Sequence, residues 1–275
     1  MTRIGPFHAS LHSAAAPLST QGGSGLVRVA TYNIHKGVRG VGPSKRLEIH
    51  NLGLAIEAFD ADLVFLQEVR LFHTREARQF DRTSFGWPKQ GQAEFLAPEG
   101  YDVAYRTNAV TRFGEHGNAL LARWPMGQVG HHDVSDHRFE QRGLLHVPVT
   151  ISGHTVHAIV VHFGLVHRSR MRQVQRLAHY IRTEIGPEAP LIVAGDFNDW
   201  GERLDGPMRE LGLSRALAPG RRRSECVTFP SVAPMFALDR FYLRGLACRS
   251  TLVPRGLAWT RMSDHLPLVA ELEIG

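Results

Sequence analysis

Polar residues end several apolar segments of the chain, and the stretch VAGDFNDW, residues 193–200, is the clearest case. Three apolar residues lead directly into Asp196, Asn198 and Asp199. Burying carboxylates at the end of a strand costs free energy unless a counter-charge offsets it. The stretch therefore indicates a tight turn, a structural ion pair or a metal-dependent reaction.

The same pattern recurs along the chain. If these ends met in one crevice, four carboxylates, two amides and two imidazoles would repel and desolvate one another, and a divalent cation would remove much of that cost. Carboxylate and amide oxygens suit Mg²⁺ or Mn²⁺, whereas zinc would require more Cys or His. The residues that share this position are Asn33, Glu68, His162, Asp196, Asn198, Asp239, Asp264 and His265.

Each of these residues also has a purely structural interpretation. Asn33 could cap a turn, Glu68 could pair with the nearby Arg70, and His162 could be a core histidine with a satisfied hydrogen bond. The GDFND stretch could form an Asx turn. The SDH stretch that contains His265 could begin a helix.

Alternating and helical apolar patterns predict the elements that position these groups. Strands are expected at 26–34, 62–69, in the YDVAYR and NALLAR stretches, and near the C-terminus. Residues 144–163 predict a hairpin that turns at Ser152-Gly153. Helices are expected at 45–59, with Ser44 as N-cap, and at 169–185, while 70–100 is expected to be a long surface excursion. The pattern favours one α/β domain with two packed sheets.

Alternation along an extended strand would point Asp196 and Asn198 toward the same crevice and Phe197 into the core. Asp199 falls out of that phase, so we expect it to be structural. Asp196 and Asn198 would then be the functional residues of the stretch.

Composition places limits on the class of protein. The 275 residues include a Ser-, Gly- and Pro-containing segment at 1–25, expected to be a flexible tail before a domain at 26–275. No apolar run approaches the ~18–20 residues of a membrane span. The two cysteines, Cys226 and Cys248, are expected to be free thiols, which predicts a reducing, cytoplasmic location. The net charge of +6 and pI of about 9.8 favour phosphate-bearing partners or anionic surfaces.

The order of seven motifs resembles the endonuclease/exonuclease/phosphatase superfamily over residues 26–275. The motifs are TYNIHKG, LQEV, GNALLARWP, VHFGL, GDFND, LDRFY and SDHLP. The NIHKG and TFP…LDRFY stretches look closest to a small bacterial branch, some of whose genes sit beside cardiolipin synthase genes. The resemblance implies a four-layer α/β sandwich, with two mixed β-sheets face to face and helices outside. It also implies a metal-dependent phosphodiesterase that uses an activated water.

The resemblance implies a role for each strand-end residue. Glu68 would be the principal metal ligand, with Asn33 and Asp264 nearby and Mg²⁺ or Mn²⁺ as the ion. Asp196 would orient or deprotonate the water, and Asn198 would hydrogen-bond a phosphate oxygen. The implied imidazole roles are phosphate contact for His265, oriented by Asp239, and a second acid/base for His162.

Some positions depart from the family pattern. In deoxyribonucleases a glutamate backs the imidazole that matches His162. That glutamate is missing at the matching position here, and Glu115 is the candidate for the carboxylate that backs His162. Asn118 is expected to face the substrate as an amide donor. His35 stands where abasic-site enzymes carry a metal-binding aspartate, which disfavours two metals. Lys36 either meets the substrate or is solvated.

Three functions stay open, and we expect a monomer in each case. A nuclease is favoured by Arg168, Arg172, Arg176 and His179 on one helix face and by the run 221–223, unless these are solvated. A phospholipid or small-molecule phosphoesterase, in contact with an anionic membrane, is favoured by aromatics in 70–100, unless these form a local core. A non-catalytic phosphate- or nucleic-acid-binding module is the third function, and a calcineurin-like phosphoesterase is the fallback fold. The aromatics are Phe72, Phe80, Phe85 and Trp87.

Overall fold

Two six-stranded sheets form the centre of the molecule. The computed structural model describes residues 25–80, 86–137 and 140–275. The first sheet has the order β13-β14-β1-β4-β6-β5, and β1 pairs parallel to β4 and antiparallel to β14. Its strands are β1 (Leu26–Asn33), β4 (Leu63–His73), β5 (Asp102–Thr111), β6 (Gly114–Ala122), β13 (Leu246–Leu252) and β14 (Leu268–Ile274).

The second sheet has the order β11-β12-β10-β9-β8-β7, with β10 parallel to β9 and antiparallel to β12. Both sheets are therefore mixed. A small separate ribbon pairs β2 (Val38–Arg39) with β3 (Arg46–Leu47). The strands of the second sheet are β7 (Gly130–Asp133), β8 (Gly143–Ile151), β9 (His154–His162), β10 (Leu191–Asp196), β11 (Ser214–Arg215) and β12 (Asp239–Arg244).

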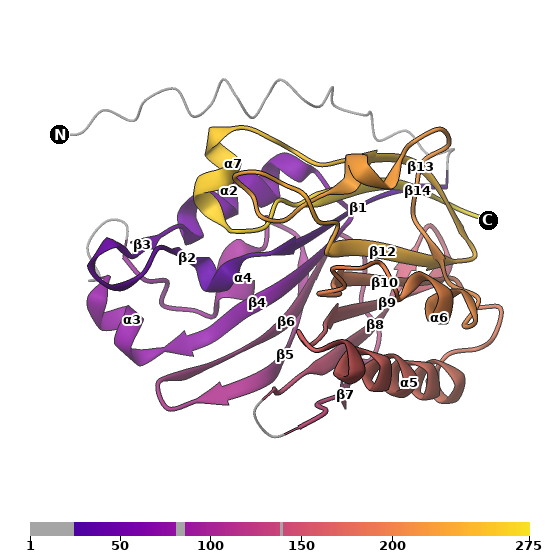
Figure 1. Ribbon diagram of the computed structural model, residues 1–275, viewed down its shortest axis with the longest axis horizontal. Helices are drawn as coiled ribbons and strands as arrows, with labels where there is room; N and C mark the ends of the chain where they lie inside the picture. Colours follow the sequence, from indigo (N-terminus) through magenta and orange to yellow (C-terminus); the bar gives the residue numbers. More distant parts are fainter. Residues whose placement is uncertain (1–24, 81–85, 138–139) are drawn as a thin grey trace.

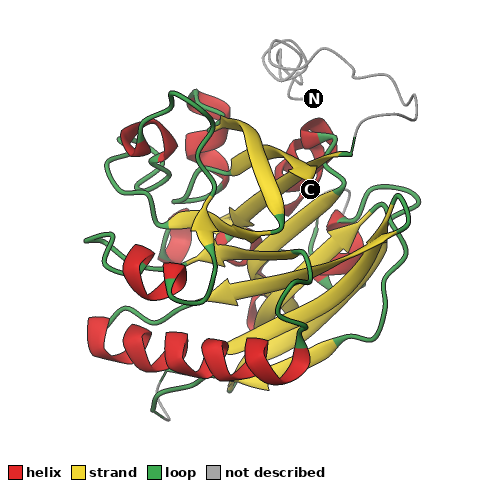
Figure 2. Ribbon diagram, turned by 90° about the vertical axis from the view of Figure 1, so that its right-hand side faces the viewer, coloured by secondary structure: helices red, strands yellow, loops and turns green. Residues whose placement is uncertain are grey.

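Helices cover the outer faces of the two sheets (Figures 1 and 2). Figure 1 shows α2 and α7 side by side over the first sheet, where Phe59 and Trp259 stack with ring centroids 5.8 Å apart. The long helix α5 lies on the second sheet. The helices are α2 (Ile49–Phe59), α3 (Thr74–Gln79), α4 (Gln92–Leu96), α5 (His167–Glu184), α6 (Asp205–Arg209) and α7 (Leu257–Met262), with 3₁₀ turns at His35–Gly37, Gly42–Ser44 and Arg223–Cys226.

Apolar side chains pack the layers together. Between the sheets, Phe65 of β4 meets the edge of Phe241 of β12 at 6.1 Å between ring centroids. On the outer face of the second sheet, Leu177 and Ile181 of α5 pack against the sheet residue Val193. This arrangement confirms the predicted two mixed sheets with helices outside.

Several predicted elements are confirmed with shifted bounds. The hairpin turns at Ser152 and Gly153, both of which have positive φ angles, and α5 covers nearly all of the predicted 169–185 helix. The prediction of Ser44 as a helix N-cap is wrong, because α2 begins at Ile49 without a side-chain cap. The described parts of the 70–100 segment also contain more regular structure than expected, namely the end of β4 together with α3 and α4.

Two further predictions concern the termini and the cysteines. All of the expected tail except Gly25 lies outside the described residues, and Gly25 accepts a hydrogen bond from the Ile274 amide. Cys226 and Cys248 are free, as expected. Within the described part of the chain, none of the helices combines the length and apolarity needed to cross a bilayer.

Candidate active site

The turn after β10 brings two polar side chains together. Gly195 has a φ of +145°, and a Cβ there would lie 1.9 Å from the Val161 carbonyl oxygen of β9, so only glycine allows this close strand pairing. β10 then ends at Asp196, whose Oδ1 accepts a hydrogen bond from the Asn198 amide at 2.9 Å. This bond is that of an Asx turn.

The turn also corrects the prediction of strand alternation. Asn198 has a φ of +48°, a left-handed conformation, so Asp196 and Asn198 are brought together by a tight turn rather than by an extended strand. Phe197 is buried as predicted and packs edge-on against Phe163 and Tyr242. The Asn198 amide nitrogen donates to the Phe163 carbonyl at 3.0 Å.

Glu68 occupies a bulge in β4. The register with β6 shifts between Leu66 and Val69, and Glu68 has a φ of +59°. A left-handed conformation is costly for a residue with a Cβ and is often retained at functional sites. The neighbouring Arg70 does not pair with Glu68, since its guanidinium Nε lies 2.7 Å from Glu76 instead.

The HKG segment, residues 35–37, brings two basic side chains to the site. All three residues have positive φ values, and the Lys36 carbonyl accepts a hydrogen bond from the buried Gln92 side chain at 2.8 Å. The Lys36 ammonium lies 2.7 Å from Glu68 Oε2. His35 Nδ1 lies 3.2 Å from Asp264 Oδ1. Lys36 is therefore a partner of the predicted metal ligand, not a solvated side chain.

Three side chains surround Asp196 Oδ2 from both sheets. The Asn33 amide at the end of β1 donates to this oxygen at 3.1 Å. His162 at the end of β9 places Nε2 3.6 Å away, and His265, just before β14, places Nε2 3.7 Å away. Asn33 and His265 come from the first-sheet side and His162 from the second, so the site lies where the two sheets meet.

His265 is held from behind by a buried carboxylate. Its Nδ1 lies 2.8 Å from Asp239 Oδ2, which also accepts a hydrogen bond from the Thr228 hydroxyl at 2.6 Å. The hydroxyl of Ser263 donates to the Asn33 carbonyl at 2.7 Å and so ties the segment before β14 to the end of β1. These contacts fix the ring so that Nε2 points toward Asp196.

The two imidazoles have opposite pKa shifts. Burial would lower the pKa of His265, but Asp239 and Asp196 outweigh it and raise the pKa to about 10. For His162, burial dominates, with help from Arg142, and lowers the pKa to about 4. At neutral pH the site therefore contains one imidazolium and one neutral imidazole.

The predicted metal ligands are ionised despite their burial. Burial opposes ionisation of Glu68, yet Lys36 and His162 hold its pKa well below the usual range. Burial likewise opposes ionisation of Asp264, whose pKa is lowered to about 2 by the His35 hydrogen bond and by His265. Glu68 raises the pKa of Asp264, so the two carboxylates interact.

The oxygen donors of this group fit a hard divalent cation in their chemistry. Glu68, Asp264 and the Asn33 amide oxygen are hard ligands of the kind that Mg²⁺ and Mn²⁺ prefer. In the described residues, however, no three or more His, Cys, Asp or Glu side chains are grouped to hold a metal. Lys36 and His35 pair with the two carboxylates, so a divalent ion would have to replace these partners.

Asp199 belongs to a separate buried ion-pair network, consistent with the structural role expected for it. Its Oδ2 lies 2.9 Å from Arg240 Nη1, and its carbonyl accepts a second bond from the same guanidinium at 2.7 Å. Arg240 also donates to the Ala237 carbonyl at 2.8 Å. This network fixes the loop that follows the GDFN turn and the residue beside Asp239.

Two residues expected to serve substrate or His162 are engaged elsewhere. The Asn118 amide nitrogen donates to the Gly143 and Val160 carbonyls at 3.1 and 3.2 Å, so it is not an open amide donor. Glu115 accepts a hydrogen bond from the Thr107 hydroxyl at 2.7 Å rather than backing His162.

The basic face of α5 is also largely occupied. Arg172 forms a bidentate pair with Asp136, and Arg176 donates to the Val134 carbonyl at 3.0 Å. Arg168 is exposed and has no carboxylate partner among the described residues. The sequence did not reveal these pairings, because they join α5 to a segment more than 30 residues away.

The fold and the site together define a two-sheet α/β sandwich with a carboxylate–imidazole site at the junction of the sheets. A family model described as the Endonuclease/Exonuclease/phosphatase family matches residues 30–265. The chain belongs to this family, whose members are generally hydrolases such as nucleases and phosphatases.

Similar proteins agree with this assignment. "Uncharacterized protein YbhP" of Escherichia coli K12 is 34% identical over 251 residues, which cover 90% of this chain and 96% of that protein. An endonuclease/exonuclease/phosphatase structure from Bacteroides vulgatus has a TM-score of 0.68 at 20% identity and covers 91% of this chain and 99% of that chain. The human Nocturnin catalytic domain with bound sulfate has a TM-score of 0.63 at 22% identity, covering 92% and 96%. At these identities, the solved structures show the shared fold.

Proposed function

We propose that the chain is a divalent-metal-dependent phosphodiesterase that hydrolyses phosphoesters by in-line attack of an activated water. The observation that supports this best is the meeting of two imidazole Nε2 atoms at one carboxylate oxygen, Asp196 Oδ2, at 3.6 and 3.7 Å. A carboxylate between a neutral and a charged imidazole has the groups that proton transfer and phosphate binding require.

In this proposal, Glu68, Asp264 and Asn33 hold Mg²⁺ or Mn²⁺. A bound ion of this kind stabilises charge on the phosphate and on the leaving oxygen. The acidic pKa values of both carboxylates keep them ionised, and therefore able to bind a cation, throughout the neutral range.

Asp196 accepts the proton of the attacking water. Its orientation is fixed through Oδ1 by the Asn198 amide and through Oδ2 by Asn33, so it does not need to reorganise. The His265 imidazolium donates to a phosphate oxygen, because Asp239 keeps its Nδ1 occupied and directs Nε2 toward the crevice at Asp196. His162 is neutral and exchanges a proton with the water or the leaving group.

The first candidate substrate is a nucleic acid. D. rerio TDP2 in complex with a single-strand DNA product shares this fold, with a TM-score of 0.62 at 15% identity, covering 90% of this chain and 99% of that chain. Exposed Arg168, together with the net charge of +6, favours a polyanionic substrate. In this proposal the chain acts as a cytoplasmic monomer.

A phospholipid or small phosphoester is the second candidate. Phe72 is 47% exposed, which favours contact with an anionic membrane surface. Phe80 and Trp87 stack on each other with centroids 6.5 Å apart, so these two rings form a local contact, and Phe85 lies outside the described residues.

The test is hydrolysis of bis-p-nitrophenyl phosphate by the purified protein with Mg²⁺ or Mn²⁺. We expect turnover that EDTA abolishes, loss of turnover in E68A, and wild-type turnover in E57A, which removes an exposed carboxylate of α2. A panel of plasmid DNA, RNA, cardiolipin and phosphatidylglycerol then identifies the substrate class. Absence of metal-dependent turnover on every phosphoester would instead support a non-catalytic binding module.

A further inference from the structure

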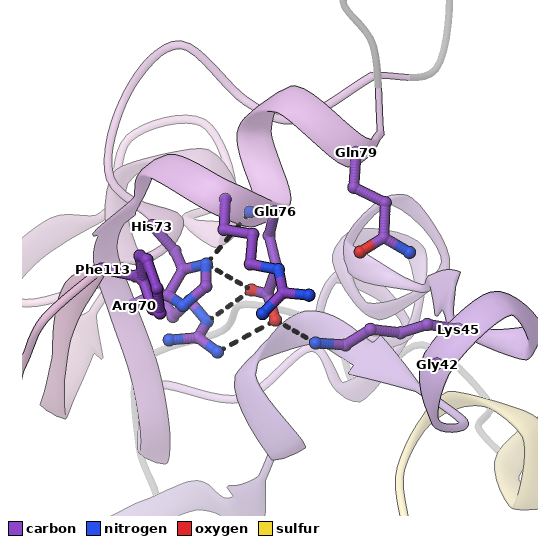
Figure 3. A pocket seen from close by; sticks show the side chains of 8 residues that line it. Gly42, Lys45, Arg70, His73, Glu76, Gln79 and Phe113 are labelled. Carbon is purple, nitrogen blue, oxygen red and sulfur yellow. Dashed lines mark hydrogen bonds and ion pairs between the residues drawn. The ribbon is translucent and has the colours of Figure 1, made fainter.

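A polar pocket lies beyond Glu68 along β4 and is not used by the mechanism (Figure 3). Its volume is ≈ 600 Å³, within the size range of small-molecule sites. It is formed by the end of β4, helix α3, the 42–45 turn and the tip of the β5–β6 hairpin. The lining residues are Gly42, Lys45, Arg70, His73, Arg75, Glu76, Gln79 and Phe113.

One buried carboxylate organises the inner wall of the pocket. Glu76, with 2% of its side chain exposed, binds Lys45, and it receives Arg70 Nη2 at 3.0 Å on the same oxygen. Figure 3 shows these two cations converging on Glu76. The carboxylate is thus shared between two cations and cannot neutralise others at the rim.

Two more guanidinium groups lie over an aromatic ring at the rim. The Arg75 and Arg112 guanidinium carbons lie 5.9 and 5.4 Å from the centre of the Phe113 ring. Neither arginine has a carboxylate partner within the described ranges. The lining therefore sets three cations, Lys45, Arg70 and Arg75, against one carboxylate, with Arg112 close by on Phe113, and this excess favours an anionic ligand.

His73 supplies a neutral donor to the same pocket. Its Nδ1 accepts a hydrogen bond from the Glu76 backbone amide at 3.1 Å, which leaves the ring proton on Nε2. Burial and the nearby Arg70 lower the pKa of His73, so the ring is neutral at pH 7. Among the described residues, none accepts a hydrogen bond from His73 Nε2, so this donor is open to a ligand.

We propose that this pocket is a second phosphate-binding subsite, which receives a further phosphate of a substrate that carries more than one. Arginine guanidinium groups match the geometry of phosphate oxygens, and the Phe113 ring provides an apolar wall for the group that carries the phosphate. Arg70 is two residues from Glu68 and His73 is five, so their Cα atoms lie at most roughly 7 Å and 18 Å from that of Glu68. One phosphate group cannot occupy both the site at Glu68 and the pocket, whereas a molecule with more than one phosphate can place one in each.

Calorimetric titration of the metal-free protein with inorganic phosphate in EDTA tests the subsite without catalysis, through the difference between two arginine variants. Arg75→Gln and Arg78→Gln remove one charge each from α3, and only Arg75 lines the pocket. We expect R75Q to weaken phosphate binding about tenfold or more, because it removes a charge-assisted contact, and R78Q to change it less than about twofold. Equal weakening in both variants, or no saturable binding by the wild type, overturns the subsite.

The role in substrate binding rests on the proposed function and needs a second measurement. With Mn²⁺, KM is compared between dithymidine phosphate with and without a 5′-phosphate, and between glycerophosphoglycerol with and without a terminal phosphate. In one of the two pairs, the extra phosphate should lower KM for the wild type and for R78Q but not for R75Q. The pair that responds shows whether the additional phosphate is carried by a nucleotide or by a glycerol headgroup. No effect in either pair overturns this role. If no compound is hydrolysed, the proposed function fails, while the calorimetry still decides the subsite.

Discussion

The ammonium of Lys36 lies 2.7 Å from the carboxylate of Glu68, the side chain proposed as the principal metal ligand. The pair is partly buried, with 28% of the Lys36 and 16% of the Glu68 side chain exposed. Lys36 is held in place because its own carbonyl is bound by Gln92. The lysine is therefore an internal cation that a divalent ion, in the proposed function, would have to displace.

Replacing this cation should change metal affinity and stability in opposite directions. In Lys36→Met, Mn²⁺ no longer competes with an ammonium, so calorimetry in the absence of substrate should show binding at least several-fold tighter. The metal-free variant should lose about 1–3 kcal/mol of unfolding free energy, because Glu68 is left without a partner.

Lys89→Met is the matched control, since Lys89 is exposed and lies outside the site. It should leave both quantities unchanged. Weaker Mn²⁺ binding by K36M would mean that Lys36 supports the metal instead of competing with it.

Asp239 should set the charge of His265. In Asp239→Asn the main group that opposes burial is neutralised, so the pKa of His265 should fall from about 10 by at least one unit, as measured by NMR of the imidazole. In the wild type this raised pKa contributes stability that is complete below about pH 6.5 and is lost as pH rises through 10. D239N should reduce that pH dependence; an unchanged pKa would contradict the role given to Asp239.

A histidine far from the site should affect stability at low pH. His146 contacts the Tyr180 hydroxyl at 3.0 Å and His157 Nδ1 at 2.9 Å, and burial, together with His157, lowers its pKa to about 4. In the unfolded chain this histidine titrates near 6.5. The contribution of the neutral His146 to the free energy of unfolding is therefore present above about pH 6.5 and is lost as pH falls through 4.

Urea unfolding of His146→Gln at pH 7.5 and 4.5 measures the effect. The stability difference between the two pH values should shrink by about 1–3 kcal/mol relative to the wild type. His154→Gln, which changes an exposed histidine in the β8–β9 hairpin, should retain the wild-type difference. The same difference in both variants would show that His146 does not titrate as described.

The sequence predicted the elements well where apolar periodicity extends over a whole strand or helix. The polar residues that end those strands, such as Asn33, His162 and Asp196, do meet in the structure. The pattern could not predict the bulge at Glu68 or the left-handed Asn198, because single backbone departures leave no periodic signal. It also could not predict partners from distant segments, which is why Glu115 was a wrong candidate for His162.

Arg240 should be the most sensitive residue near the site that takes no part in catalysis. With 1% exposure it binds Asp199 and the Ala237 carbonyl, so Arg240→Met leaves the buried Asp199 carboxylate with only the more distant Arg170, at 3.9 Å, as a charge partner. We expect a loss of about 3–5 kcal/mol in the free energy of unfolding. The exposed Arg255→Met should change it by less than about 0.5 kcal/mol, and a similar value for R240M would contradict the structural role of the network.

The most direct test of the central claim is the turnover of bis-p-nitrophenyl phosphate with Mn²⁺ by Asp196→Asn. The Asp196 carboxylate accepts hydrogen bonds from the Asn198 backbone amide and from the Asn33 side chain. It lies in the crevice where His162 and His265 also meet. We expect a loss of about 10²–10⁴-fold in kcat, the range for removal of a general base, with a thermal midpoint close to that of the wild type. Turnover within tenfold of the wild type in the folded variant would contradict it.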